Sequence, residues 1–208
     1  MDVQEAKTVF RGSTISVATP FTEDFELDLD ALRKNIRFMI DRGVKRGNGL
    51  LLVAAAGGEF PMLSFDERLQ VIKASVEAAA GEIEVAASIQ FNGTREAVKF
   101  ARRAHEAGAS LGQLSSPYYY PPPEEDIFRF FKAVSDDTDL PIMVYNNWWN
   151  TPNMNVNTVD RLAELPNVVA LKWSAPNSGQ FSEGLHRLAE RLAIIDNNGQ
   201  IVWSNVMG

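Results

Sequence analysis

The sequence predicts a (β/α)₈ TIM barrel that forms a single domain over residues 1–208 and lacks its eighth strand–helix unit and its C-terminal helices. Seven short apolar segments alternate with helix-like patterns, as in a parallel sheet covered by helices. A doubly wound nucleotide-binding sheet is disfavoured, because Pro20-Phe21-Thr22 follows the first segment in place of a glycine-rich phosphate turn. Eight units usually need about 250 residues. The chain is therefore expected to be a fragment or to receive its closing strand from elsewhere.

The first elements are delimited by proline, glycine and apolar periodicity. A strand is expected over residues 14–19, where a β-branched run stops at Pro20. The next helix opens near Asp28 and repeats apolar side chains at helical spacing up to Gly43. The second strand is expected over residues 50–55, because a continuous apolar run is typical of a strand buried on both faces.

The middle of the chain carries clear helix signals. Ser64 and Glu67 have the spacing of a capping box, which predicts the start of a helix that ends near Gly81. The third strand is expected over residues 85–89, and a helix follows it over residues 94–107.

The later elements repeat the same alternation. A weaker fourth strand precedes a proline-stiffened loop, and three acidic residues from Glu124 then suit the positive end of a helix. The remaining expected strands are residues 111–115, 141–145, 168–173 and 192–196, and a last helical stretch covers Gln200 to Met207.

The composition indicates what kind of molecule the protein binds. The chain has 208 residues, 45% of them hydrophobic and 23% charged, with a formal net charge of −7. Its basic residues do not cluster, so nucleic acid and membrane partners are not expected, and a small molecule is. There is no cysteine, and the two histidines, His105 and His186, lie far apart, so a metal site is not expected. No organic cofactor is expected either, because the lysine chemistry considered below needs none. The absence of a leader pattern and of a long apolar run predicts a cytoplasmic protein.

The candidate chemistry lies where the expected strands end, because barrel enzymes place their sites there. Lys172 stands on an otherwise apolar strand, and a buried ammonium is costly, so it either reaches solvent or is a reactive amine. A desolvated lysine beside a phenol such as Tyr145 can form a Schiff base with a ketone. Trp148 and Trp149 either line a pocket or pack between subunits.

The motifs together resemble the dihydrodipicolinate synthase and N-acetylneuraminate lyase family of Schiff-base aldolases and hydro-lyases. The likeness runs through essentially the whole chain and depends on the order and spacing of its motifs. They are residues 14–21 (Thr-Ile-Ser-Val-Ala-Thr-Pro-Phe), Gly58-Glu59, Leu63-Ser64, Glu67-Arg68, Pro117-Tyr118-Tyr119, residues 140–146 (Leu-Pro-Ile-Met-Val-Tyr-Asn), Asn167-Val168 and Lys172.

The resemblance implies a role for each matching residue. It makes Lys172 the Schiff-base lysine and Tyr145 the phenol that exchanges protons with a 2-oxo acid substrate. Tyr119 is implied to reach into a neighbouring subunit's site, so a homo-oligomer, either a dimer or a tetramer, is expected. The expected substrate-binding residues are Ala56, Gly57, Gly58, Tyr118, Asn147 and Asn150.

Two departures from the family pattern bear on the substrate. The family turn normally reads Gly-Thr-Thr-Gly-Glu, whereas Ala56 and Gly57 offer backbone amides but no relay hydroxyl. Asn150 stands where the dihydrodipicolinate synthases place an arginine, which disfavours that activity, and Glu59-Phe60 with Leu63 resembles the branch that dehydrates keto-deoxy sugar acids. Aldolase and dehydratase chemistry both remain open. The alternative is a truncated or catalytically incompetent homologue that acts only as an oligomer-forming protein.

Overall fold

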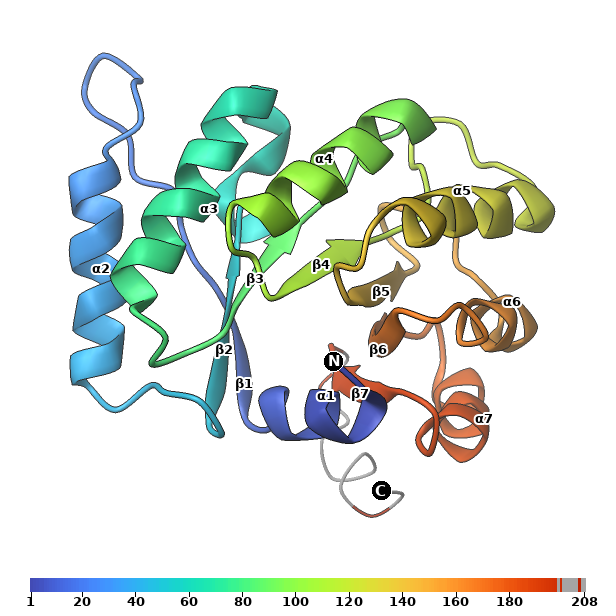
Figure 1. Cartoon of the computed structure of the whole chain (residues 1–208). Coiled ribbons are helices and arrows are strands. Elements are labelled where there is room, and N and C mark those ends of the chain that lie inside the picture. The colour runs from blue at the N-terminus through green and yellow to red at the C-terminus, as the bar shows by residue number, and fades with distance from the viewer. Residues whose placement is uncertain (198, 200–205, 207–208) are drawn as a thin grey trace.

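The computed structural model describes residues 1–197, 199 and 206 and contains a seven-stranded parallel sheet in the order β1 to β7. The sheet curls into a nearly closed barrel with helices outside it (Figure 1), so the predicted TIM barrel is confirmed. In the described part of the chain no strand pairs with the outer edges of β1 and β7. The helix expected from Gln200 to Met207 lies outside the described residues, apart from Val206. The strands are β1 Ser13–Ser16, β2 Gly49–Val53, β3 Val85–Ser88, β4 Leu111–Leu114, β5 Ile142–Asn147, β6 Val168–Ser174 and β7 Ala193–Asp196.

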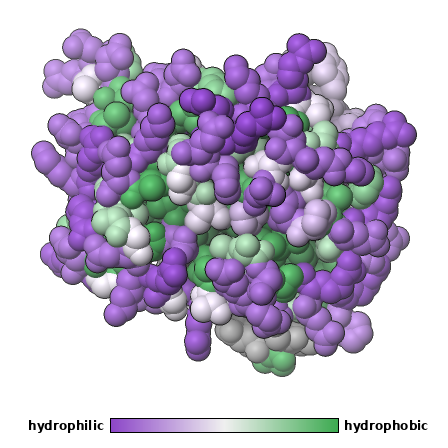
Figure 2. Space-filling view, viewed as in Figure 1, coloured by the Kyte–Doolittle hydropathy of each residue, from purple (hydrophilic) through white to green (hydrophobic). Residues whose placement is uncertain are grey.

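Six helices cover the outside of the barrel (Figure 1). The predicted capping box is confirmed at the start of α3, where the Ser64 amide donates to Glu67 and the Glu67 amide donates to Ser64 Oγ. The face of the molecule seen in Figure 2 is mostly hydrophilic, while the inner faces of the helices pack on the sheet. The helices are α2 Leu29–Asp41, α3 Phe65–Ala79, α4 Thr94–Glu106, α5 Glu124–Asp137, α6 Val156–Leu162 and α7 Ser178–Leu188.

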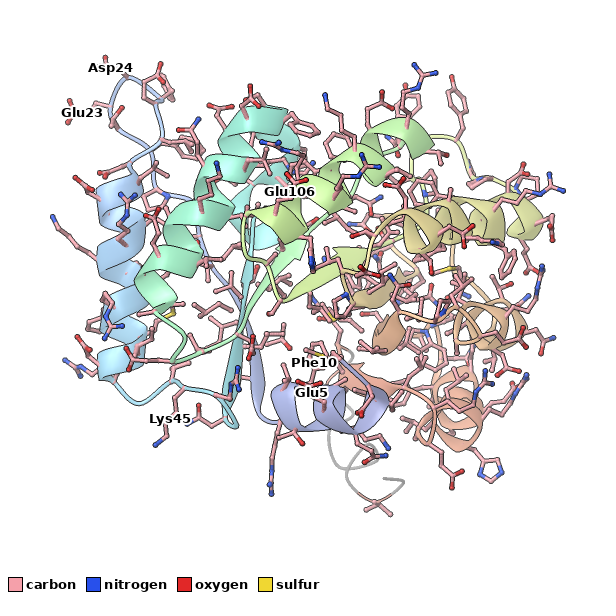
Figure 3. The ribbon with its side chains drawn as sticks, viewed as in Figure 1. Glu5, Phe10, Glu23, Asp24, Lys45 and Glu106 are labelled. Carbon is pink, nitrogen blue, oxygen red and sulfur yellow. The ribbon has the colours of Figure 1, made fainter. Side chains whose placement is uncertain are left out.

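A further helix, α1 (Val3–Val9), was not predicted from the sequence. Its buried side chains Ala6 and Val9, with Phe10 after it, join an interior cluster that includes Leu111 and Ala193 from the first residues of two strands. Phe10 lies at the same end of the barrel as Lys45, which precedes β2, and opposite the loop after β1 (Figure 3). The helix therefore closes the end of the barrel at which the strands begin. A helix of seven residues is too short for its apolar periodicity to be recognised in the sequence.

Strand boundaries differ from the prediction at two places that shape the site. The second strand ends at Val53 because Ala54 adopts a positive φ of 46°, and two short 3₁₀ turns follow, η1 (Ala56–Gly58) and η2 (Phe60–Met62). The fifth strand runs beyond Tyr145 to Asn147, because its pairing with β6 continues to Ser174. Both changes lie at the carboxyl ends of the strands.

Candidate active site

Lys172 and Tyr145 are register partners on neighbouring parallel strands, so their side chains point to the same face of the sheet. The lysine Nζ lies 4.6 Å from the centroid of the tyrosine ring. Residues two positions before them, Met143 and Ala170, belong to the cluster inside the barrel. The pair therefore stands in the barrel interior, above an apolar floor.

Burial shifts the acidity of both groups. It lowers the pKa of the Lys172 amine below its ordinary value and is the cause of the shift. No ion pair holds the ammonium form within the described part of the chain. Burial also raises the pKa of Tyr145, while a side-chain hydrogen bond with Asn197 opposes that rise. The amine is thus biased toward its neutral, nucleophilic form, and the phenol toward its protonated form.

A cavity of about 300 Å³ opens beside Tyr145 at the carboxyl ends of the strands. It brings together four of the residues predicted from the sequence, namely Ala56, Tyr118, Tyr145 and Asn150. Its full lining is Ala56, Phe60, Pro61, Ser88, Gln90, Gln113, Ser115, Tyr118, Tyr145, Asn150 and Thr151. None of these side chains is cationic or carries a carboxylate.

One wall of the cavity comes from residues that sequence reasoning missed. Ser88 is the last residue of β3, and Gln90 lies two residues beyond it. Gln113 lies in β4, and Ser115 directly follows that strand. Each pair is spaced by two residues, which places both members on one face. That alternation of polar residues at the end of an apolar strand was the signal available in the sequence.

Three predicted residues lie near the cavity without lining it. A Cβ at Gly57 would lie 2.5 Å from Ser16 Oγ, and one at Gly58 would lie 2.8 Å from the Val17 carbonyl oxygen, so both glycines allow η1 to pack tightly against β1. Asn147 is fully buried and accepts a hydrogen bond from the Asn150 amide. These residues shape the turns beside the cavity.

Tyr119 does not reach the cavity of its own chain. Its side chain is 74% exposed and its ring packs edge-on against Tyr120. A role at the site of a neighbouring subunit, as the family resemblance implies, stays a prediction.

Lys172 does not line this cavity but lines a second one, of about 670 Å³. This cavity lies between the unpaired edges of β1 and β7, and its lining includes Thr14, Ile195 and Asn197. Asn197 is tied to the barrel by its Nδ2 donating to Ser174 Oγ at 2.7 Å. Among the described residues, Lys172 therefore borders the gap between β1 and β7.

Arg68 supports the cavity from behind. The side chain is 3% exposed and donates to the carbonyl oxygens of Ser88, at 2.7 Å, and Gln90, at 3.0 Å. Its guanidinium lies over the rings of Phe91 and Phe100, and burial lowers its pKa to about 9. The arginine thus fixes the end of β3, which carries two lining side chains.

Two classes of feature are not found in the described residues. No group of three or more His, Cys, Asp or Glu side chains there is arranged to hold a metal ion. None of the described helices has the length and apolar character needed to cross a membrane.

The fold and site together define a parallel (β/α) barrel protein with a partly desolvated lysine beside a tyrosine at the end where barrel enzymes place their chemistry. The chain belongs to the Dihydrodipicolinate synthetase family, whose sequence profile matches residues 9–201. The family resemblance found in the motifs is thereby confirmed.

Curated relatives agree with this assignment. The chain is 35% identical over 193 residues to a protein of Chloroherpeton thalassium and 36% identical over 195 residues to one of Aquifex aeolicus, both named 4-hydroxy-tetrahydrodipicolinate synthase. These alignments cover 92% and 93% of this chain but 63% and 65% of the relatives. The chain therefore spans a little under two thirds of their length. The names give no support to the expectation that dihydrodipicolinate synthase activity is disfavoured.

Solved structures show the same fold. A dihydrodipicolinate synthase from Aquifex aeolicus matches with a TM-score of 0.84 at 38% identity, over 90% of this chain and 63% of that one. A chloride-inhibited dihydrodipicolinate synthase from Acinetobacter baumannii, complexed with pyruvate, matches with a TM-score of 0.88 at 28% identity, over 96% and 68%. A monomeric dihydrodipicolinate synthase variant matches with a TM-score of 0.85 at 28% identity, over 97% and 67%.

Proposed function

We propose that this protein is a class I lyase, either an aldolase or a dehydratase, in which Lys172 forms a Schiff base with a 2-oxo acid or a keto-deoxy sugar acid. The observation that carries the proposal is the pairing of a partly desolvated amine with a half-buried phenol that lines a cavity. Family membership supports it, and so does the pyruvate complex of the Acinetobacter baumannii relative.

The chemistry follows from the two shifted groups. The neutral amine of Lys172 attacks the ketone carbon to form a carbinolamine, and loss of water then yields an iminium. Tyr145 gives and takes the protons of these steps, which its contact with the Lys172 amine and its protonated phenol support. Loss of a proton from the neighbouring carbon gives an enamine, which can add to an aldehyde or expel a hydroxide as water. Either route ends with hydrolysis of the iminium and release of the lysine.

The contacts with the substrate are inferred from the position of each residue relative to the cavity. The backbone amides of Ala56 and Gly57 open η1 beside the cavity and bind the 2-oxo acid carboxylate. The side chains of Tyr118 and Asn150 line the cavity and contact the rest of the substrate. Gly58 and Asn147 act through the turns that they stabilise, since neither lines the cavity.

Trapping with pyruvate and borohydride tests the proposal. Reduction of the iminium is expected to add the mass of a reduced pyruvyl group at Lys172, as read by peptide mass spectrometry. Lys172→Met is expected to abolish the adduct. The control Lys45→Met removes an exposed lysine at the other end of the barrel and is expected to retain it (Figure 3). An adduct that is absent, or that forms elsewhere, overturns the Schiff-base assignment.

The particular reaction of the relatives is a second candidate. Their name, 4-hydroxy-tetrahydrodipicolinate synthase, favours condensation of the pyruvyl enamine with aspartate semialdehyde. Loss of pyruvate that depends on aspartate semialdehyde would support this candidate, and trapping of pyruvate without such consumption would exclude it.

The open side of the barrel favours a further alternative, a catalytically incompetent homologue. The cavity of about 670 Å³ that Lys172 lines between β1 and β7, as the described residues leave it, would let water screen the charges that such a site must stabilise. Trapping of pyruvate without turnover of any 2-oxo acid would favour this alternative.

Assembly into a homo-oligomer is proposed from the aromatic surface around the cavity. Tyr118, Tyr119 and Tyr120 precede α5, and Trp148 and Trp149 follow β5, and all five side chains are exposed to solvent. Sedimentation of the parent protein and of a Tyr119→Ser variant tests this expectation. A monomeric parent protein would refute it.

A further inference from the structure

The β3 and β4 wall of the cavity is built from neutral polar side chains. Ser88, Gln90, Gln113 and Ser115 line it, and all four are at least nine-tenths buried. Buried polar groups are costly unless they find hydrogen-bond partners. The partners of these groups therefore indicate what the wall is built to contact.

Both polar atoms of the Gln90 side chain have partners within the protein. Its Oε1 accepts from the Ser115 amide at 2.8 Å and from Ser115 Oγ at 2.6 Å, and its Nε2 donates to the Ser116 carbonyl oxygen at 3.2 Å. This network ties the ends of β3 and β4 together. It gives both polar atoms of Gln90 a partner within the protein, leaves one Nε2 hydrogen unused, and holds Ser115 Oγ in place.

Gln113 is different, because its side chain forms no hydrogen bond with any described residue. The side chain is 6% exposed, and its Oε1 is buried without a partner. The residue lines the cavity, so a ligand in the cavity is in a position to supply the missing donor. A buried acceptor of this kind favours a ligand with a hydroxyl group and disfavours one with an apolar chain.

We propose that Gln113 determines the specificity of this site by accepting a hydrogen bond from a hydroxyl group on the carbon chain beyond the 2-oxo acid unit. The ligand class is a 2-oxo acid with a neutral, hydroxylated chain, formed from or cleaved to a hydroxyaldehyde. The inference rests on the proposed Schiff-base function. A second carboxylate is a poorer match for this wall, because the cavity lining contains no cation to balance its charge and Gln113 offers it only a neutral amide donor.

Aldol addition is the reaction that tests the hydrogen bond proposed between Gln113 and a substrate hydroxyl group. The enamine carbon of Lys172-bound pyruvate forms a bond to the aldehyde carbon, the aldehyde oxygen takes up a proton, and water releases the product from the iminium. Pyruvate and glyceraldehyde together then give a 4-hydroxy-2-oxo acid with two further hydroxyl groups. Propanal gives the matching product without those two groups.

The experiment compares kcat/KM for glyceraldehyde and for propanal, with pyruvate saturating, in four forms of the 208-residue protein. Gln113→Met removes the acceptor at similar length and is expected to lower the glyceraldehyde-to-propanal ratio about tenfold. Gln113→Glu keeps an acceptor oxygen and is expected to retain most of the ratio. Gln70→Met makes the same chemical change on the exposed face of α3 and is expected to leave the ratio unchanged.

Borohydride trapping of pyruvate in each variant separates the possible failures. If Gln113→Met is trapped like the parent protein but its ratio is unchanged, the specificity role of Gln113 is wrong and the Schiff-base function stands. The same conclusion holds if the parent protein is trapped but shows no preference for glyceraldehyde. If the parent protein is not trapped at all, the proposed function fails and the subsite fails with it.

Discussion

The side chain of Asn146 holds the loop after β5, which contributes residues to the cavity lining, by two hydrogen bonds that we call the clamp. Replacement of Asn146 by alanine tests how much the clamp stabilises the protein. The side chain is fully buried, its Nδ2 donates to the Met154 carbonyl oxygen at 2.7 Å, and its Oδ1 accepts from the Met154 amide at 3.0 Å. The segment between them contains Asn150 and Thr151, which line the cavity. The two bonds therefore hold this segment in place across eight residues.

The stability lost in Asn146→Ala can be estimated from the hydrogen-bond partners that the Met154 backbone keeps. The Met154 amide loses its partner while buried, at a cost of about 1–3 kcal/mol, whereas the carbonyl oxygen keeps a longer bond from Gln180 and loses about 1 kcal/mol. The expected loss in the free energy of unfolding is about 2–4 kcal/mol, measured by urea unfolding followed by circular dichroism. The variant is also expected to trap pyruvate less efficiently.

The control for this prediction is Asn153→Ala in the same loop. Asn153 is exposed and makes one long bond, at 3.4 Å, to Gln180, so its loss is expected to change stability by less than about 0.5 kcal/mol. Equal stability of the two variants would show that the clamp does not hold the loop in solution.

Two further predictions concern helix α7 and Lys172. A Cβ at Gly184 would clash with the buried ring of Trp173, so Gly184→Ala is expected to lower the free energy of unfolding by at least about 1–3 kcal/mol, while Gly179→Ala in the same helix meets only Asn177 Oδ1, at 3.3 Å, and is expected to be tolerated. Urea unfolding of both variants tests this prediction, and equal losses of unfolding free energy in Gly184→Ala and Gly179→Ala would contradict it. Burial lowers the pKa of Lys172, so the unfolded chain binds more protons than the folded chain between that lowered pKa and the ordinary value of 10.5. Lys172→Met is therefore expected to be more stable than the parent protein at neutral pH, and its advantage is expected to shrink by up to about 1.4 kcal/mol per pH unit in that window. A stability difference that stays constant from pH 7 to pH 10.5 would refute the shift.

The periodic elements were predictable because their signals are local. The capping box at Ser64 and Glu67 and the apolar strand from Val168 depend on residues close together in the chain, and both are confirmed. Helix α1 was missed, since its seven residues are stabilised by packing against β6 and β7, almost the whole chain away. The end of β2 was missed for a local reason, the positive φ of Ala54, which alanine rarely adopts.

The sequence by itself determined the barrel class and the family, and it predicted Lys172 and Tyr145 as the reactive pair, because order and spacing along the chain carry that information. Only the tertiary structure decided which side chains share the cavity. It brought Gln113 to the wall and left its acceptor without a partner, and it placed Tyr119 on the surface. It also showed that Lys172 lines the cavity between β1 and β7, while its neighbour Tyr145 lines the cavity that contains Gln113. The physical reason is that burial and hydrogen-bond satisfaction are properties of residues distant in the chain, and they exist only once the strands are in register.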